Sequence, residues 1–286
     1  MHPEPTAALI ERILGHVTRN VHRNDSLPHN GLVPDIVMCS VCATPIEARY
    51  APTCIHCREA RKGPFADQLA DFVVPLSYAI KGFEGLQQAY YDMFRYKRPP
   101  TSRDSVSRVT QLLKSLSTFH LACLEARTGL PVSFVSYVPS GRSPDHDTPL
   151  ARISRALTTG TWVAARHSGA RRGPMPQDRA TTIDPDLVEF DHTFSGHTVI
   201  VEDSWVTGRS AQSAAISAHQ NGAQFVTIVA IARVLDYRWE VSRRLVDSWP
   251  RNATWRVTAC PVWGLDHRIP LDPGESQTPV DHHQST

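Results

Sequence analysis

Residues 199–210 read Val199-Ile200-Val201-Glu202-Asp203-Ser204-Trp205-Val206-Thr207-Gly208-Arg209-Ser210. The β-branched run over 198–201 is typical of an interior parallel strand, and it ends in two adjacent carboxylates. An alanine-rich helical segment follows over 210–221, with Gly222 as its C-terminal stop, and a second apolar run covers 225–231. The pattern predicts a strand–helix–strand unit whose connection is right-handed.

The turn between this strand and this helix suits a ligand that carries both hydroxyls and a phosphate. A helix N-terminus presents free N–H groups and a partial positive charge, and Gly208 lets the backbone approach an anion closely. Thr207 and Ser210 add hydroxyl donors. Two carboxylates would repel a bare phosphate, so we expect Glu202 and Asp203 to face sugar hydroxyls or Mg²⁺. The alternative is an ordinary turn with an acidic N-cap.

The pattern resembles the phosphoribosyl-pyrophosphate (PRPP) motif of type I phosphoribosyltransferases. That motif is an apolar strand, two acids, three residues, Thr-Gly, one residue, and then Thr or Ser. The resemblance implies that Glu202 and Asp203 are the catalytic acids that bind the ribose hydroxyls. It also implies that the 5′-phosphate is bound by Thr207, Gly208, Arg209 and Ser210.

Four of the six cysteines form two Cys-x-x-Cys pairs separated by eleven residues: Cys39, Cys42, Cys54 and Cys57. Two such pairs predict a closed tetrahedral site for structural zinc. The alternatives are disulfides, which the lack of a secretory signal at the N-terminus disfavours, and scattered core cysteines. His56 is interpreted as an exposed bystander. Cys123 and Cys260 are interpreted as inert, and His120 as a buried histidine.

The cysteine pairs and the PRPP motif together resemble the ComF-like (competence protein F) phosphoribosyltransferases, also described as amidophosphoribosyltransferase-like. The resemblance spans about residues 36 to 235 and includes a Lys/Tyr pair at Tyr96-Lys97. It implies that pyrophosphate, with Mg²⁺, is bound by the segment after the strand predicted at 131–138, at Ser140, Gly141 and Arg142. The chain departs from the family in two places: the Arg-Gly-Phe-Asn-Gln stretch is absent, and the acidic pair is Glu-Asp.

The expected fold class is therefore α/β, a type I phosphoribosyltransferase-like parallel sheet flanked by helices, with a small N-terminal zinc ribbon. The expected organisation is an N-terminal helix and linker over 1–35, the ribbon over 36–62, the phosphoribosyltransferase-like domain over 63–269 and a disordered tail over 270–286. Apolar residues at helical spacing predict a long helix over 105–127, capped by Gly129. Residues 167–180, rich in Gly, Arg and Pro, predict a mobile loop.

The expected function is PRPP-dependent transfer of the phosphoribosyl group to an unknown nitrogen acceptor, with release of pyrophosphate. The alternative is a non-catalytic accessory protein that senses PRPP or a nucleotide, or handles nucleic acid. A net charge of +2 is too small to imply nucleic acid binding overall, but basic clusters at 95–103 and 166–179 could contact polyphosphate, nucleic acid or a protein partner. No apolar stretch is long enough for a membrane span, and we expect a cytoplasmic protein. A homodimer is expected by analogy with the superfamily.

Overall fold

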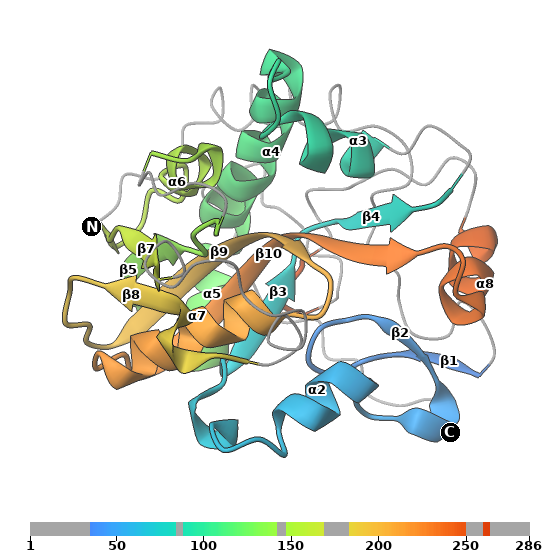
Figure 1. Ribbon diagram of the computed structural model, residues 1–286, viewed down its shortest axis with the longest axis horizontal. Helices are drawn as coiled ribbons and strands as arrows, with labels where there is room; N and C mark the ends of the chain where they lie inside the picture. Colours follow the sequence, from blue (N-terminus) through green and yellow to red (C-terminus); the bar gives the residue numbers. More distant parts are fainter. Residues whose placement is uncertain (1–34, 84–87, 142–146, 169–182, 250–259, 264–286) are drawn as a thin grey trace, which may run out of the picture.

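The computed structural model describes residues 35–83, 88–141, 147–168, 183–249 and 260–263. Arg142, the predicted N-terminal helix, the predicted tail and most of the loop predicted at 167–180 lie outside these residues. Within them, a six-stranded sheet has the order β3-β10-β9-β5-β6, with β4 pairing to β10 (Figure 1). Every pairing in this sheet is parallel. Its strands are β3 (Phe72–Pro75), β4 (Tyr78–Lys81), β5 (Val132–Tyr137), β6 (Thr161–Trp162), β9 (His197–Trp205) and β10 (Phe225–Asp236). The predicted α/β fold class is confirmed.

The two central strands are longer than the sequence pattern predicts. The run 199–201 is almost fully buried in β9, as expected of an interior strand. However, β9 continues to Trp205, because Glu202 pairs with Ala230 and Ser204 pairs with Ala232 of β10. The acidic pair therefore lies within the strand and not in the turn after it. Strand β10 extends to Asp236 because its second half pairs with β4.

Helices cover both faces of the sheet. From β3 the chain passes along α3 (Gln88–Arg95), α4 (Arg103–Ser115) and α5 (Leu121–Thr128) to β5, and then along α6 (Pro149–Ser154) to β6. Both connections lead toward the β6 edge of the sheet. The connection from β9 through α7 (Arg209–Gln220) to β10 runs in the opposite direction. Right-handed connections then place α7 on one face and α3 to α6 on the other. The contacts agree, since α7 packs on β9 and β10 while α4 packs on α6 and β10.

The helix predicted over 105–127 is present with one interruption. Helix α4 begins after Ser102, whose hydroxyl oxygen accepts a hydrogen bond from the Ser105 N–H at 3.3 Å. A π-helical segment, Leu116–His120, separates α4 from α5. The chain then leaves α5 through Gly129 at a φ of 71°, which confirms the predicted glycine cap.

The N-terminal cysteines lie in a small unit, called the ribbon below, formed by β1 (Ile36–Met38), β2 (Pro45–Glu47) and α2 (Ile55–Ala60). Strands β1 and β2 are antiparallel. The ribbon lies beside the end of β10 and helix α8 (Glu240–Ser248), which packs on β2 (Figure 1). The Tyr78 hydroxyl on β4 donates a 2.8 Å hydrogen bond to the Ala43 carbonyl of the ribbon. The buried ribbon residues and the sheet share one hydrophobic core.

Strands β7 (Ala165–His167) and β8 (Val188–Phe190) pair antiparallel, and β8 packs against α7, which also packs on β9 and β10 of the sheet. All residues of α7 from 211 to 218 are consequently buried. Many of them are alanine, whose small side chain permits this close packing on two sides. Helix α7, whose N-terminus follows the sequence motif, is therefore firmly held.

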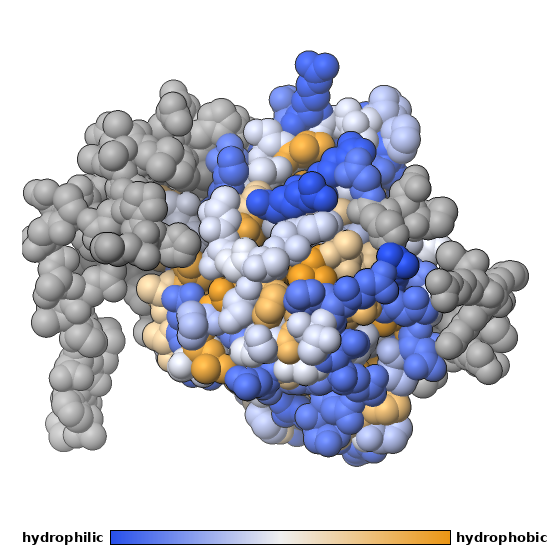
Figure 2. Space-filling model, turned by 90° about the vertical axis from the view of Figure 1, so that its left-hand side faces the viewer, coloured by the Kyte–Doolittle hydropathy of each residue, from blue (hydrophilic) through white to orange (hydrophobic). Residues whose placement is uncertain are grey.

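The face of the molecule in Figure 2 is mainly hydrophilic, with apolar residues in small groups between the polar ones. Among the helices of the described residues, none is long and apolar enough to cross a bilayer. A group of exposed aromatic side chains lies on α3, at Tyr90, Tyr91 and Phe94.

Candidate functional site

The sheet changes direction between β5 and β9. The connection after β5 leads toward β6 on one face, and the connection after β9 leads toward β10 on the other. A crevice forms beyond the carboxyl ends of strands at such a switch point, and ligands of open α/β sheets bind there. The two strands are still joined at this edge, where the Val138 N–H donates a 2.9 Å hydrogen bond to the Val201 carbonyl. Beyond it opens a cleft of about 680 Å³.

The cleft brings together eight of the nine residues that the sequence analysis expects to bind substrate, which come from segments far apart in the chain. The residues of this set that line the cleft are Ser140, Gly141, Glu202, Asp203, Thr207, Gly208, Arg209 and Ser210. Arg142 lies outside the described residues. Residues 96–98, between α3 and α4, form another part of the wall. Thr148 and His167 also line the cleft, although no sequence motif singled them out.

The loop between β9 and α7 depends on a glycine. Gly208 has a φ of 82°, in the left-handed region that favours glycine. A Cβ atom at this position would lie 2.1 Å from Cζ2 of Trp205, whose buried ring supports the loop. Gly208 is the N-cap residue of α7 and has no side chain that could cap the helix, whose N-terminus carries the partial positive charge that favours a bound anion. The loop is thus shaped for close backbone approach to an anionic ligand.

Arg233 supports the loop between β9 and α7. Its side chain is buried in β10, and Nη1 donates hydrogen bonds to the carbonyl oxygens of Trp205 at 2.6 Å and Val206 at 2.8 Å. Three carbonyls, with that of Val234 at 3.1 Å, thus surround one guanidinium nitrogen. Sequence analysis missed Arg233 because the predicted strand ended at Ile231. The available signal was a single charge within an apolar run that continues to Leu235.

Two residues of the connection between α3 and α4 bind Asp203, one member of the acidic pair. Asp203 Oδ2 accepts hydrogen bonds from the Tyr96 hydroxyl at 2.6 Å and from Lys97 Nζ at 2.5 Å. Burial opposes ionisation of Asp203, but the Lys97 ammonium and the Tyr96 hydroxyl outweigh it and lower the pKa of this carboxyl. Burial and the charge of Asp203 raise the pKa of Tyr96, which therefore stays protonated as a donor. Asp203 is the ionised member of the pair.

Glu202 behaves in the opposite way. Burial, and then the negative charge of Asp203, raise the pKa of Glu202 well above its ordinary value. Its Oε1 accepts one long hydrogen bond, 3.4 Å from the Ser204 N–H. Neighbouring carboxyl groups whose pKa values are driven apart are common at functional sites, because the chemistry there needs groups with shifted pKa values.

We expect Glu202→Gln to stabilise the ligand-free protein at neutral pH. Because the folded pKa of Glu202 is raised, folding loses stability as the pH rises from the unfolded carboxyl pKa, about 4.3, through the folded value. Glutamine removes this cost. Each unit of the shift corresponds to about 1.4 kcal/mol, or roughly 2–4 °C in melting temperature for a chain of this size.

Thermal unfolding of both proteins from pH 4 to pH 8 checks this result. The gain in melting temperature should be largest at the upper end and should disappear toward pH 4. Glu59→Gln is the control, because Glu59 is exposed and pairs with the exposed Lys62, so its removal should give no pH-dependent difference. A melting temperature of Glu202→Gln at or below that of the wild type at pH 7 would contradict the raised pKa.

The opposite wall of the cleft is formed by a close contact between two segments. A Cβ atom on Gly141 would lie 2.9 Å from Nε2 of His167, on β7. Burial lowers the pKa of His167, so the neutral imidazole is favoured at neutral pH. Thr148 caps α6 by accepting a hydrogen bond from the Ala151 N–H at 3.2 Å. This side of the cleft therefore offers backbone and neutral polar groups.

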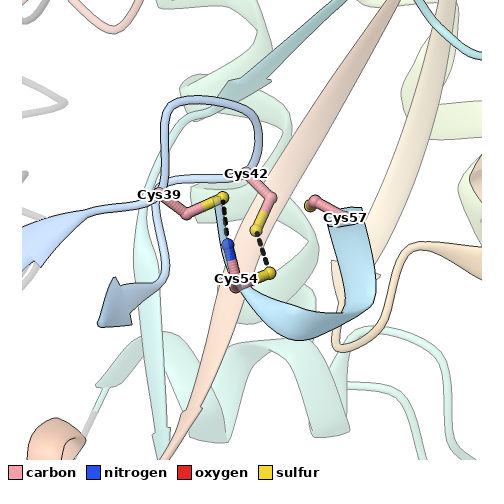
Figure 3. A group of neighbouring side chains, drawn as sticks. All are labelled: Cys39, Cys42, Cys54 and Cys57. Atoms are coloured by element: carbon pink, nitrogen blue, oxygen red, sulfur yellow. Dashed lines mark hydrogen bonds between the residues drawn. The ribbon is translucent and has the colours of Figure 1, made fainter. Parts of the chain in front are cut away.

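The four ribbon cysteines converge on one point (Figure 3). All are buried and free, and their sulfur atoms lie within 4.8 Å of one another. Cys42 Sγ is 3.8 Å from Cys54 Sγ, close to the separation of roughly 3.8 Å for two thiolates 2.3 Å from a tetrahedral zinc. The Cys54 N–H also donates to Cys39 Sγ at 3.3 Å, which favours a thiolate there. The cluster is consistent with a small zinc ribbon and fits a structural metal.

The ribbon and the β9–α7 loop share a second cavity, of about 390 Å³. Helix α2 forms one side, with Ile55 and His56, and the loop forms the other, with Trp205, Thr207 and Arg209. His56 is half-buried here, in contrast to the exposed position expected. Burial and the nearby positive charge of Arg209 lower its pKa. The ribbon is therefore directly adjacent to the candidate phosphate loop.

Neither a scan against protein-family models nor a search of the curated proteins finds a match for this chain.

Proposed function

We propose that the cleft binds PRPP with Mg²⁺ and that the protein transfers the phosphoribosyl group to a nitrogen acceptor, releasing pyrophosphate. One observation carries the proposal. The Gly208 turn and the N-terminus of α7 open into the same cleft as the acidic pair and the Ser140-Gly141 segment, at the switch point of the sheet. A phosphate, a ribose and a pyrophosphate each need one of these three features.

Each part of the ligand has a matching group. The backbone N–H groups at the start of α7, with the hydroxyls of Thr207 and Ser210, suit the 5′-phosphate. Asp203, held ionised by Lys97 and Tyr96, suits the ribose hydroxyls as a hydrogen-bond acceptor. The backbone of Ser140-Gly141 borders the space for the pyrophosphate. When bound, Mg²⁺ would supply positive charge that neutralises the leaving pyrophosphate.

The acidic pair would also act on the reaction. The bond between C1′ of the ribose and the pyrophosphate oxygen breaks, and positive charge develops on the ribose ring. Ionised Asp203 would stabilise this charge electrostatically from within the cleft, and the developing positive charge would in turn favour ionisation of Glu202. The rigid placement of the loop by Arg233 and Trp205 holds the phosphate end and orients the ribose.

We also propose zinc as the metal of the ribbon. Four buried sulfur donors within 4.8 Å of one another match the four-cysteine structural zinc sites of proteins. Such a site has no coordination position for a substrate, so the ribbon would support the loop and take no part in the transfer.

Calorimetric titration of PRPP into the metal-loaded protein, with and without Mg²⁺, tests the proposal. We expect saturable binding that requires Mg²⁺. Asp203→Ala should weaken it by about ten- to a hundredfold, since hydrogen bonds to a charged group contribute roughly 1.5–3 kcal/mol. Asp191→Ala is the matched control, because Asp191 is an exposed carboxylate, paired with Arg166, that does not line the cleft. Absence of binding, or equal affinity in the two variants, would refute the assignment.

One observation favours the non-catalytic alternative. Tyr90, Tyr91 and Phe94 are exposed together on α3, and the guanidinium carbon of Arg98 lies 3.9 Å from the centre of the Phe94 ring. Aromatic and basic side chains in one surface patch suit the stacking of single-stranded nucleic acid. If the titration shows no PRPP binding, binding of single-stranded DNA that weakens steeply with salt is the next property to measure on this surface.

A further inference from the structure

A second group of metal-binding side chains lies away from both the cleft and the ribbon. It consists of His120, Cys123 and Cys260, each of which offers one donor atom, and these atoms lie within 4.8 Å of one another. His120 and Cys260 are buried, with 2% and 0% of their surface exposed, and Cys123 is partly buried. The sequence predicts a buried histidine and two inert cysteines, but the fold places the three side chains together.

The chain is shaped locally to bring these residues together. His120 ends the π-helical segment at φ −129° and ψ 7°, outside the α-helical region, and α5 begins at the next residue. Such π segments often occur at functional sites. Cys123 follows His120 by three residues, the spacing at which side chains of a helix share a face. The interruption of the helix thus presents a His-x-x-Cys pair on one side.

The third donor comes from the other end of the described chain. Residues 260–263 pack against this region, where the guanidinium of Arg127 lies over both the Phe72 ring and the Trp263 ring, at 5.2 and 4.9 Å from their centres. Cys260 and Val262 join the main hydrophobic core. The segment is therefore held in contact with α5, and Cys260 faces the His-x-x-Cys pair.

The donor set selects the class of metal. One imidazole nitrogen and two sulfurs are ligands that zinc and other thiophilic ions prefer. Two thiolates bound to a tetrahedral zinc lie roughly 3.8 Å apart, so donors within 4.8 Å of one another need shifts of about 1 Å or less. The four ribbon cysteines meet the same 4.8 Å limit. The ribbon offers four buried donors, whereas this cluster offers three, of which Cys123 is partly buried.

We propose that His120, Cys123 and Cys260 bind a second zinc-class ion, independent of the ribbon. Three protein ligands leave one coordination position for water. The ion would join the segment 260–263 to the start of α5 and fasten it to the core. This inference does not depend on the function of the cleft, because none of the three residues lines it.

Metal analysis of the full chain, purified under reducing conditions without chelator, tests the proposal. We expect about two equivalents of zinc in the wild type and about one in Cys123→Ala and in Cys260→Ala. Val262→Ala is the matched control, because it loosens the same segment without removing a donor and should keep two equivalents. Loading with Co²⁺ adds a second measurement, since Cys260→Ala should lose only the absorption of a site with two thiolates and keep that of a four-thiolate site.

Three results would overturn the proposal. One is a single equivalent of metal in the wild type. Another is an unchanged metal content and Co²⁺ spectrum in Cys260→Ala. The third is a Cys123–Cys260 disulfide, detected by mass spectrometry in the freshly purified protein that holds one metal ion. If Cys260→Ala does not fold, Cys123→Ala supplies the same comparison from a residue that is only partly buried.

Discussion

Gly208→Val should abolish PRPP binding while the protein remains folded. Valine would have to adopt a φ of 82°, which is strongly disfavoured for a β-branched side chain. Its Cβ would also lie 2.1 Å from Cζ2 of Trp205, whose ring is buried and closely packed. The loop must therefore move away from its position at the start of α7. We expect a loss of affinity of more than about a hundredfold, as for the removal of several charge-assisted hydrogen bonds.

Gly129 supplies the control for the backbone strain. Its φ of 71° is similar to that of Gly208, but a Cβ there meets nothing within 4 Å, and Gly129 lies at the end of α5, outside the cleft. Gly129→Ala and Gly208→Ala should each cost about 1 kcal/mol of stability from the left-handed backbone alone. Only Gly208→Ala should also weaken PRPP binding. Calorimetry and thermal unfolding of both variants measure the two effects separately.

Two results would contradict this account. Wild-type affinity in Gly208→Val would show that the loop does not contact the ligand. Equal loss of affinity in Gly129→Ala would show that general destabilisation, and not the shape of the loop, controls binding. Circular dichroism of each variant, recorded before the titration, establishes that the compared proteins are folded.

The local features of the site are predictable from the sequence because they depend on neighbours in the chain. The β-branched run at 199–201 forms an interior strand since no polar side chain interrupts it. The position of Gly208 follows from the need for a left-handed residue between a strand and a helix. The convergence of the four cysteines is likewise predictable from their two Cys-x-x-Cys pairs, because this short spacing is typical of ligands in one metal site.

The partners of these features are not predictable, because they come from elsewhere in the chain. Lys97 contacts Asp203 across 106 residues, and no periodicity in either segment indicates that pairing. Arg233 is a similar case. The role of this arginine in a buried strand can be recognised only when the positions of its partners, the carbonyls of Trp205 and Val206, are known. The extent of β9 through the acidic pair was also hidden, because β10 supplies its hydrogen-bonding partner. Tertiary pairing thus overrides the local preference of acidic residues for turns.

Loss of the ribbon metal is expected to have the largest effect on stability. Binding of zinc to small metal domains contributes about 10–16 kcal/mol of apparent free energy, and such domains unfold without it. Cys57→Ser should lower the melting temperature by about 10 °C or more, because even a few kcal/mol corresponds to this shift at the size of this chain.

Ser40→Ala is the matched control. Ser40 lies in the turn between Cys39 and Cys42, so this variant keeps all four ligands and should match the wild type. Thermal unfolding and zinc content of both variants test this, and a wild-type melting temperature in Cys57→Ser would refute a structural metal in the ribbon.

The effect of this loss should reach the cleft as well. Helix α2, which carries Cys57, forms one wall of the cavity whose other wall is the loop at Trp205 and Thr207. The ribbon core is also continuous with that of the sheet, so its collapse removes packing from beneath the phosphate loop. Cys57→Ser should therefore bind PRPP more weakly than the wild type even at a temperature where the sheet remains folded. Unchanged affinity in the zinc-free variant would instead show that the loop is held by Arg233 and β10 alone, with the ribbon acting only on stability.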